Sequence, residues 1–286
     1  MAMIDVIVQG MLLGGLYTIF AVGLSLIFGV MRLVNIAHGD FLVLAAYVGH
    51  MIVAALGLNP WLALIVLVPV MAGLGYLLQR FLLDRVMGED TLPPLLVTFG
   101  LAIIIQNSLL AGFSTNSMRI PSGTMETASL DLLGIHVGIL PLVTFAIAVI
   151  LIAGLELIFT HTRAGRAFRA TSDDPEIAEA IGVKTRHVFA LAMALCFVTI
   201  AIAGVLLAMR SSFDPFSGPA RLIYGFEAVI IGGLGSFWGT LAGGVILGVA
   251  QSLGAQISPQ MQILAGHVVF FVILAIRPRG LFARTV

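Results

Sequence analysis

Residues 160–187 read THTRAGRAFRATSDDPEIAEAIGVKTRH and interrupt a chain that is otherwise overwhelmingly apolar. Five of the chain's 14 lysine and arginine residues lie in this stretch, which we call the island. Within it, Asp174 can cap a helix that starts at Pro175. Glu176 adds a negative charge to the first turn of this helix. Gly182 can end the helix, because glycine readily adopts the left-handed backbone conformation. The island therefore predicts a helix of seven residues that ends just before Gly182.

A helix this short is unstable alone in water, because nucleation costs more than a couple of turns return. Ile177 and Ile181 would be exposed on it, so we expect the helix to lie in a groove of another protein. The island would then be a docking device on the cytoplasmic side of a membrane protein. The alternative is a solvated loop whose helix packs back on its own chain, and the local sequence alone favours that alternative. The rest of the chain reverses this preference.

Composition places the chain in a membrane. Of its 286 residues, 60% are hydrophobic and 10% charged, and the mean hydropathy is +1.12. A soluble domain of this size could not bury that much apolar surface. The net charge is zero and the basic residues form no broad face, so no nucleic-acid partner is expected. The single Cys196 offers neither an internal disulfide nor a metal cluster.

The N-terminal segment is expected to stay in the mature protein. It carries Asp5 and no lysine or arginine before Arg32, which is the opposite of a secretory leader. About 20 apolar residues cross the hydrocarbon core, and the segment after Asp5 exceeds that length.

Several uncharged stretches are long enough to span a membrane. The predicted spans are 6–31, two within 41–79 that divide at 58–60, 91–118, 132–155, 188–209, 237–256 and 261–276, with a short or re-entrant element at 222–234. The expected fold is an all-α transmembrane helix bundle of eight or nine segments, some of them discontinuous. It forms a single transmembrane domain over 1–286, with the island as its cytoplasmic segment.

Basic residues predict the orientation, because lysine and arginine are retained on the cytoplasmic side. The island and the tail after residue 276 are the most basic stretches and are assigned to the inside. Counting back from the island places 116–131 outside and 80–90 inside. The N-terminus is therefore expected outside and the C-terminus in the cytoplasm.

Glycine spacing indicates close helix packing near the C-terminus. Gly235, Gly239 and Gly243 recur every four residues, as do Gly244 and Gly248. This spacing lines small residues along one helix face and lets a neighbouring helix approach closely.

Two interrupted stretches, 35–41 (NIAHGDF) and 224–227 (YGFE), are each followed by a run of small apolar residues. If their weak likeness is real, they form an internal repeat of two discontinuous elements. Many transporters build their central pathway in this way.

Charged residues at these breaks need an explanation, because a carboxylate at mid-membrane is costly. Asp40 and Glu227 are expected to lie near the interface or to face water or partners inside the bundle. His38 is interpreted as a hydrogen-bonded residue at a helix end. His50 and His267 are interpreted as lone core histidines.

Enzyme motifs are absent from the sequence. Residues 182–185 (GVKT) lack the glycine before the lysine and the upstream glycine of a phosphate loop. Ser236 and His267 could form an intramembrane hydrolase site, but two common residue types without an orienting partner are a very weak signal. We therefore expect no catalytic residue, cofactor or metal.

Several motifs resemble one family. Residues 23–30 (GLSLIFGV) and 34–41 (VNIAHGDF) are similar to the start of the leucine/isoleucine/valine class of ABC-importer permeases. The island resembles the cytoplasmic coupling loop of that class, although 179–182 departs from the E-A-A-x-x-x-G spacing of other bacterial importer permeases. Residues 225–244, which contain GFEAVIIGGLGS and GTLAGG, resemble its late glycine-rich motif. The likeness covers nearly the whole chain.

The resemblance implies a permease subunit in the bacterial inner membrane that imports branched-chain or other apolar amino acids. Implied partners are separate ABC ATPase subunits, a second permease chain, an extracytoplasmic substrate-binding protein and the lipid bilayer. The alternatives are an importer of urea or short amides and, from another class, an ion-coupled carrier or channel.

Two sets of candidate residues follow. The residues expected to couple to the ATPase are Asp174, Glu176, Ile177, Glu179, Ala180, Ile181 and Gly182. The residues expected to line the translocation path are Asn35, His38, Gly39, Asp40, Glu227, Gly232 and Gly233.

Overall fold

The computed structural model describes residues 2–88, 90–132 and 135–282. This part is almost entirely helical. Its helices are α1 (Ala2–Met31), α2 (His38–Leu56), α3 (Pro60–Phe81), α4 (Leu92–Phe113), α5 (Ile139–His161), α6 (Arg163–Asp173), α7 (Pro175–Ala180), α8 (Thr185–Arg210), α9 (Gly218–Gly232), α10 (Phe237–Ile257) and α11 (Pro259–Ile276). Two short 3-10 helices, η1 (Leu83–Arg85) and η2 (Gly123–Glu126), and an antiparallel hairpin of β1 (Ser129–Leu132) and β2 (Ile135–Gly138) complete it.

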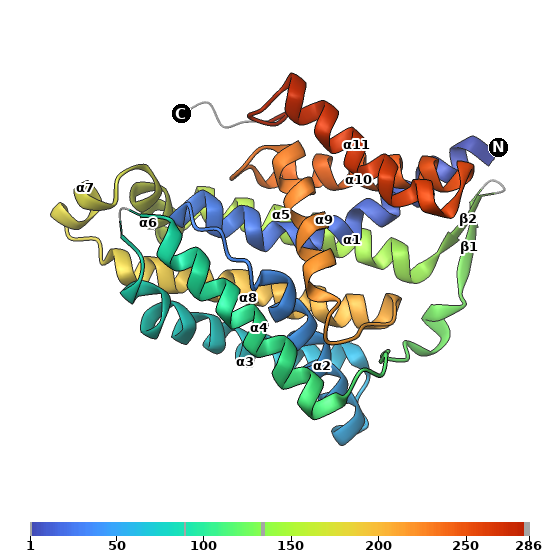
Figure 1. Ribbon diagram of the computed structural model, residues 1–286, viewed down its shortest axis with the longest axis horizontal. Coiled ribbons are helices and arrows are strands. Elements are labelled where there is room, and N and C mark those ends of the chain that lie inside the picture. The colour runs from blue at the N-terminus through green and yellow to red at the C-terminus, as the bar shows by residue number, and fades with distance from the viewer. Residues whose placement is uncertain (1, 89, 133–134, 283–286) are drawn as a thin grey trace.

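Eight of the described helices are long and apolar enough to cross a membrane: α1, α2, α3, α4, α5, α8, α10 and α11. The expected all-α polytopic bundle is confirmed. Figure 1 shows α6 and α7 at one end of the molecule, and the start of α1 with β1 and β2 at the other. We call these the island end and the hairpin end.

Most predicted boundaries agree with the structure. The break at 58–60 is confirmed: Gly57 ends α2 in a left-handed conformation (φ 61°), and the Asn59 side chain accepts the Trp61 N–H at 3.0 Å at the start of α3. The fifth span is the main exception. It begins at Ile139 and not at 132, because the polar segment before it continues into the hairpin, where β1 and β2 satisfy each other's backbone groups.

The predicted glycine spacing forms two helix contacts: Gly239 and Gly243 of α10 face α9, and Gly244 and Gly248 face α1. A Cβ atom added at Gly14 would lie 2.5 Å from Cα of Val245, and one at Gly10 would lie 2.6 Å from Cα of Val249. On the other helix, a Cβ at Gly244 would lie 2.7 Å from the carbonyl oxygen of Gly14. Only glycine allows the two backbones to lie this close along their length.

Two non-helical segments interrupt the bundle, and they run in opposite directions. Residues 32–37 follow α1 and lead from the island end back into the bundle, where α2 starts. Residues 211–217 follow α8 and lead inward from the hairpin end to the start of α9. Helix α1 packs on α10 and α8 packs on α3. This is the packing that an inverted repeat of α1–α4 and α8–α11 predicts.

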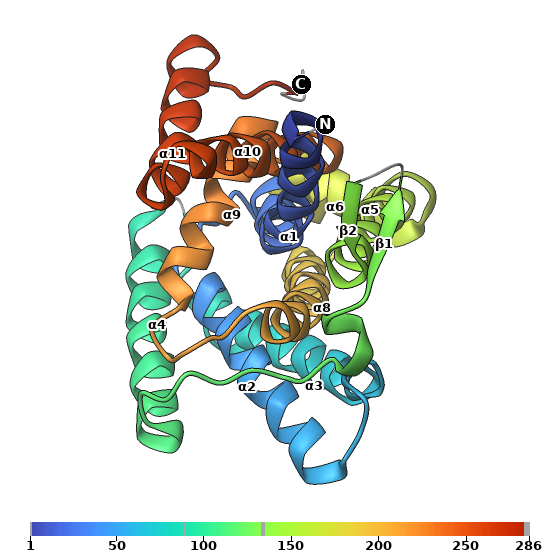
Figure 2. The ribbon, with the colours of Figure 1, turned by 90° about the vertical axis from the view of Figure 1, so that its right-hand side faces the viewer.

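The second break was expected at 224–227, and that position is wrong. Residues 224–227 lie inside α9, and the break precedes this helix. Its backbone is held by a bridge in which Phe213 and Met118 exchange hydrogen bonds of 2.8 and 3.0 Å. Figure 2, viewed from the hairpin end, shows α9 between α10 and α11 on one side and α2 and α4 on the other.

Candidate functional site

The island folds as its capping residues predict. The Asp174 carboxylate accepts the backbone N–H groups of Glu176 at 2.9 Å and Ile177 at 3.0 Å. Gly182 has the expected left-handed conformation, with φ of 93°. Helix α7 runs over Pro175–Ala180 and is therefore one residue shorter than predicted.

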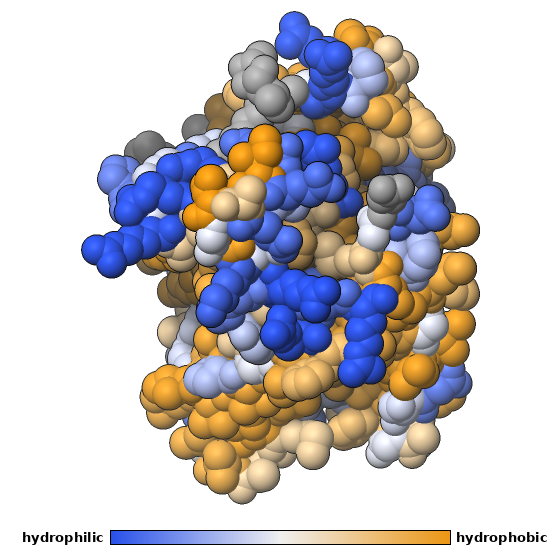
Figure 3. Space-filling view, turned by 90° about the vertical axis from the view of Figure 1, so that its left-hand side faces the viewer, coloured by the Kyte–Doolittle hydropathy of each residue, from blue (hydrophilic) through white to orange (hydrophobic). Residues whose placement is uncertain are grey.

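One side of α7 is turned away from the bundle. Ile177 is 63% exposed and Ile181 is 73% exposed, whereas Ala178 is 2% exposed and faces its own chain. Ala180 is exposed, and Glu179 accepts a hydrogen bond from the Thr185 hydroxyl, which holds the loop closed. Figure 3 shows hydrophilic side chains gathered over this end of the molecule, with apolar side chains on its flanks.

Helix α6 attaches the island to the bundle. Phe168 is buried and stacks on Phe159 of α5, with ring centroids 5.1 Å apart. The Arg169 guanidinium donates to the carbonyl oxygen of Phe159. Ser172 donates its hydroxyl to the carbonyl oxygen of Gly29 at 2.6 Å, two residues before the end of α1. Sequence reasoning missed Ser172, because its partner is 143 residues away.

The first break is held by buried polar groups. The Asn35 side chain accepts the Ala37 N–H at 3.0 Å. Nε2 of His38 lies 3.0 Å from the carbonyl oxygen of Phe20, so this nitrogen is the donor. The prediction of a hydrogen-bonded helix-end histidine is confirmed.

Asp40 faces partners inside the bundle, as one of the two expectations had it. It is 2% exposed, and its carboxylate accepts a hydrogen bond from Gln106 of α4 at 2.9 Å. The starts of α2 and α9 meet here, because a Cβ at Gly218 would lie 2.8 Å from Cγ of Asp40 and one at Gly39 would lie 2.8 Å from the carbonyl carbon of Gly218. The two discontinuous elements therefore come together inside the bundle.

Glu227 lies on α9, is 4% exposed and pairs with Nδ1 of His267 on α11. The interpretation of His267 as a lone core histidine is wrong: its side chain is 35% exposed and holds a carboxylate. The hydrolase alternative loses support, because the Ser236 hydroxyl instead accepts the Gly239 N–H at 3.1 Å and caps α10.

Gly232 and Gly233 form a tight crossing at the end of α9. A Cβ at Gly232 would lie 2.7 Å from the backbone nitrogen of Thr240 and closer still to the carbonyl group of Gly239. Gly233 has φ of 105°, which side chains rarely tolerate. The segment after α11 binds here: Leu281 and Phe282 donate their N–H groups to the carbonyl oxygens of Ile231 and Gly232, both at 2.9 Å.

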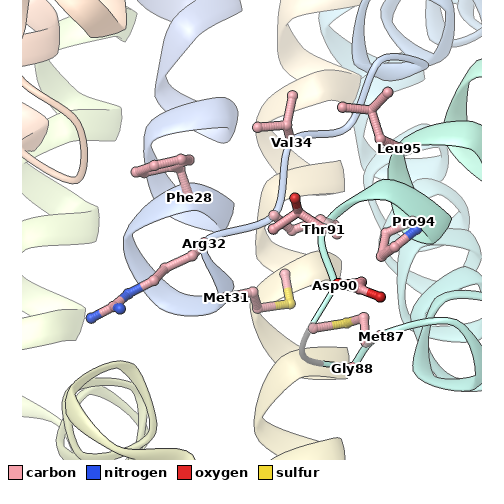
Figure 4. Close-up of a pocket in the computed structure, with 11 residues that line it drawn as sticks. Phe28, Met31, Arg32, Val34, Met87, Gly88, Asp90, Thr91, Pro94 and Leu95 are labelled. Atoms are coloured by element: carbon pink, nitrogen blue, oxygen red, sulfur yellow. The ribbon is translucent and has the colours of Figure 1, made fainter.

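A pocket of about 340 Å³ opens beside the first break. Figure 4 shows Phe28 and Met31 from the end of α1, with Arg32 just after it, on one side of the pocket, and Met87 and Pro94 among the residues opposite. Arg32 has φ of 52°, an unusual left-handed value for a residue with a side chain, and it turns the chain from α1 into the break.

Comparison with known proteins identifies relatives over nearly the whole length. A family model described as the permease component of the branched-chain amino acid transport system matches residues 6–277. The chain is 26% identical to the high-affinity branched-chain amino acid transport system permease protein BraD of Pseudomonas aeruginosa, over 97% of this chain and 95% of that protein. It is 30% identical to the probable branched-chain amino acid transport permease protein LivH of Methanocaldococcus jannaschii, over 83% and 76%.

A relative named for another cargo also matches. The fructose import permease protein FrcC of Rhizobium meliloti is 27% identical over 85% of this chain and 69% of that protein. No solved structure matches the chain.

Proposed function

This chain belongs to the family of branched-chain amino acid transport permease components, and on that premise we propose that it is the membrane subunit of an ATP-driven importer of branched-chain or other apolar amino acids. The observation that carries the proposal is the match over 6–277, which includes both discontinuous elements and the island. The protein would reside in the bacterial inner membrane.

We place the translocation path where the two discontinuous elements meet. Asn35, His38, Gly39 and Asp40 belong to the first element, and Glu227, Gly232 and Gly233 belong to the second. Irregular backbone at membrane depth is tolerated only where protein or a water-filled cavity covers it. The breaks before α2 and α9 are therefore suited to line a path and unsuited to face lipid.

Three partners complete the proposed importer. ABC ATPase subunits would dock on α7 and the residues around it, from Asp174 to Gly182. A second permease chain would supply the other wall of the path, which agrees with Ile223 of the short α9 being 48% exposed. A substrate-binding protein would deliver the cargo at the hairpin end.

Uptake by cells that contain the chain with its partner subunits tests this function. We expect import of labelled leucine, isoleucine or valine that stops when ATP is depleted and persists when ion gradients are collapsed. Import of urea or short amides in their place would favour the related importer class. Import that follows an ion gradient and needs no partner chain would favour a secondary carrier.

Reporter fusions test the proposed orientation. A reporter that is active only outside the cytoplasm should work when it is fused after Ser122, near the hairpin end, and fail when it is fused after Ser172 in α6. Activity after Ser172 with none after Ser122 would reverse the assignment of the two ends.

Glu227→Gln tests the path. We expect slower uptake at matched membrane levels of protein, because the amide replaces the carboxylate that contacts Nδ1 of His267. The order of preference among leucine, isoleucine and valine should stay the same, since the delivering protein is expected to set it. Glu126→Gln, at the end of η2, is the matched control and should transport normally. A changed order in Glu227→Gln would place side-chain selectivity in this chain.

A further inference from the structure

Six polar side chains from four helices gather where α9 crosses α1. We call them the α9 cluster: Tyr17 of α1, Arg221, Tyr224 and Glu227 of α9, Gln251 of α10 and His267 of α11. Tyr17 donates its hydroxyl to Oε1 of Gln251 at 2.5 Å, and its ring lies 5.0 Å from that of Tyr224. Arg221 lies close enough to both tyrosines to interact electrostatically with them.

The cluster is continuous across these helices. Arg221, Tyr224 and Glu227 follow each other at intervals of three along α9, so they line adjacent positions of one helix side. The Gln251 amide reaches α11, because a Cβ added at Gly266 would lie 2.9 Å from its Nε2. Gly266 directly precedes His267, which pairs with Glu227.

The α9 cluster lies at mid-depth. Tyr17 is halfway along α1, a helix of 30 residues that runs the length of the bundle. Charged side chains at this depth are rare and are usually functional. Of the six residues, sequence reasoning placed only Glu227 in the candidate path, and it did not consider Tyr17, Arg221 or Gln251 at all. The available signal was Arg221, which lies six residues before Glu227 in an otherwise uncharged stretch.

Three polar atoms of the α9 cluster are buried without a hydrogen-bond partner: Nε of Arg221, Oε2 of Glu227 and Nε2 of Gln251. Two of these side chains are almost fully enclosed, since Glu227 is 4% exposed and Gln251 is 1% exposed. Unsatisfied buried donors and acceptors are unfavourable, and so many in one cluster require a polar partner. A helix-packing role alone does not explain them.

The free groups match the two charges of an amino acid. A guanidinium is the preferred partner of a carboxylate, and a carboxylate oxygen accepts a hydrogen bond from an ammonium group. Gln251 adds an uncharged donor. The α9 cluster also has an open side: His267 is 35% exposed, and Ile223, one helical turn before Glu227, is 48% exposed.

We propose that the α9 cluster is a recognition site for the zwitterionic α-amino carboxylate group of the cargo, with Arg221 facing the carboxylate and Glu227 facing the ammonium group. This inference rests on the proposed function and adds a recognition step inside the permease. The site reads the group that all α-amino acids share. A preference for particular amino-acid side chains can therefore still be set by the delivering protein.

Protection of an introduced thiol tests the site. Cys196 is fully buried and is the chain's only cysteine, so Cys196→Ala gives a background without reactive thiols. Ile223→Cys in this background places a thiol beside the α9 cluster. The importer, with its partner subunits but without the delivering protein, is reconstituted in lipid discs. The rate of alkylation by a hydrophilic reagent is then measured against leucine concentration.

We expect leucine to slow the alkylation, whereas leucinamide, which lacks the carboxylate, and 4-methylpentanoate, which lacks the ammonium group, should not. Arg221→Gln and Glu227→Gln should each raise the leucine concentration needed for half protection by about tenfold or more, as loss of one hydrogen bond to a charged group does. Arg221→Lys keeps the charge and should lose less. Arg119→Gln and Glu126→Gln remove equivalent charges outside the cluster and should leave protection unchanged.

Several results would overturn the site. They are a thiol at residue 223 that does not react, equal protection by all three compounds, or unchanged protection in both cluster variants. The comparison of the three compounds needs no change within the cluster, so it stands even if a cluster variant fails to fold. Labelled leucine uptake by the same importer in sealed lipid vesicles, with the delivering protein added, separates the two proposals. Uptake without protection removes the site alone, and protection without ATP-driven uptake contradicts the proposed function.

Discussion

Uptake should be lost in the variant Gly232→Leu, and the amount of folded protein in the membrane should fall sharply. A Cβ at this position would lie 2.7 Å from the backbone nitrogen of Thr240, and a leucine adds three further carbon atoms. The opposing groups are backbone atoms of α10, which cannot rotate away as a side chain can. Overpacking of a tight core costs about 1–3 kcal/mol and sometimes more, and we expect this crossing to lie at or above the upper end.

Gly154→Leu is the matched control for this prediction. Gly154 lies in the membrane-crossing helix α5, and a Cβ there would meet nothing within 4 Å. The same substitution should therefore leave folding and uptake intact, and replacing a helical glycine can even stabilise the helix. The measurements are labelled leucine uptake and the fraction of protein that remains monodisperse in mild detergent. Normal uptake by Gly232→Leu would show that transport does not need the close crossing of α9 and α10.

Ile177→Asp should abolish transport without affecting insertion or folding. Ile177 is 63% exposed on a helix of six residues, and changes at such positions alter stability by only about 0.5 kcal/mol. If the ATPase holds this side chain in a groove, a buried carboxylate would weaken docking by about 2 kcal/mol or more, roughly 30-fold. The amount of ATPase that copurifies with the permease should fall, and the rate of leucine uptake should fall with it. Ile257→Asp changes an isoleucine that is 81% exposed at the hairpin end, and both quantities should stay normal.

Crosslinking locates the same contact directly. In the Cys196→Ala background, cysteines introduced at Ile177 and Ile181 should crosslink to the ATPase, and one at Ser122 should not. Glu179 is a poorer position, because its carboxylate holds the hydroxyl of Thr185. If neither isoleucine position crosslinks although the ATPase is present in the membrane, the docking proposal is wrong.

The features that could be predicted from the sequence are those set by neighbouring residues. Apolar length identified eight spans, with the fifth starting late because a hairpin precedes it. Asp174 and Gly182 fixed both ends of the island helix through hydrogen bonds and backbone conformation within a few residues. The glycine spacing at 243–248 indicated a close helix contact but not which helix would fill it.

Only the tertiary structure decided which polar groups meet. The Tyr17–Gln251 contact joins residues 234 positions apart, and the Glu227–His267 pair joins two helices that local sequence presents as independent. Neither pairing leaves a periodic signal, because each depends on how the helices cross. The sequence by itself determined that this chain spans a membrane, where it breaks first and how the island is capped. The direction in which the second break returns, and the polar cluster that α9 brings together, depend on how α9 packs against α1, α2 and α10. Glycines at these contacts let the backbones approach closely, and that contact is made between residues far apart in the sequence.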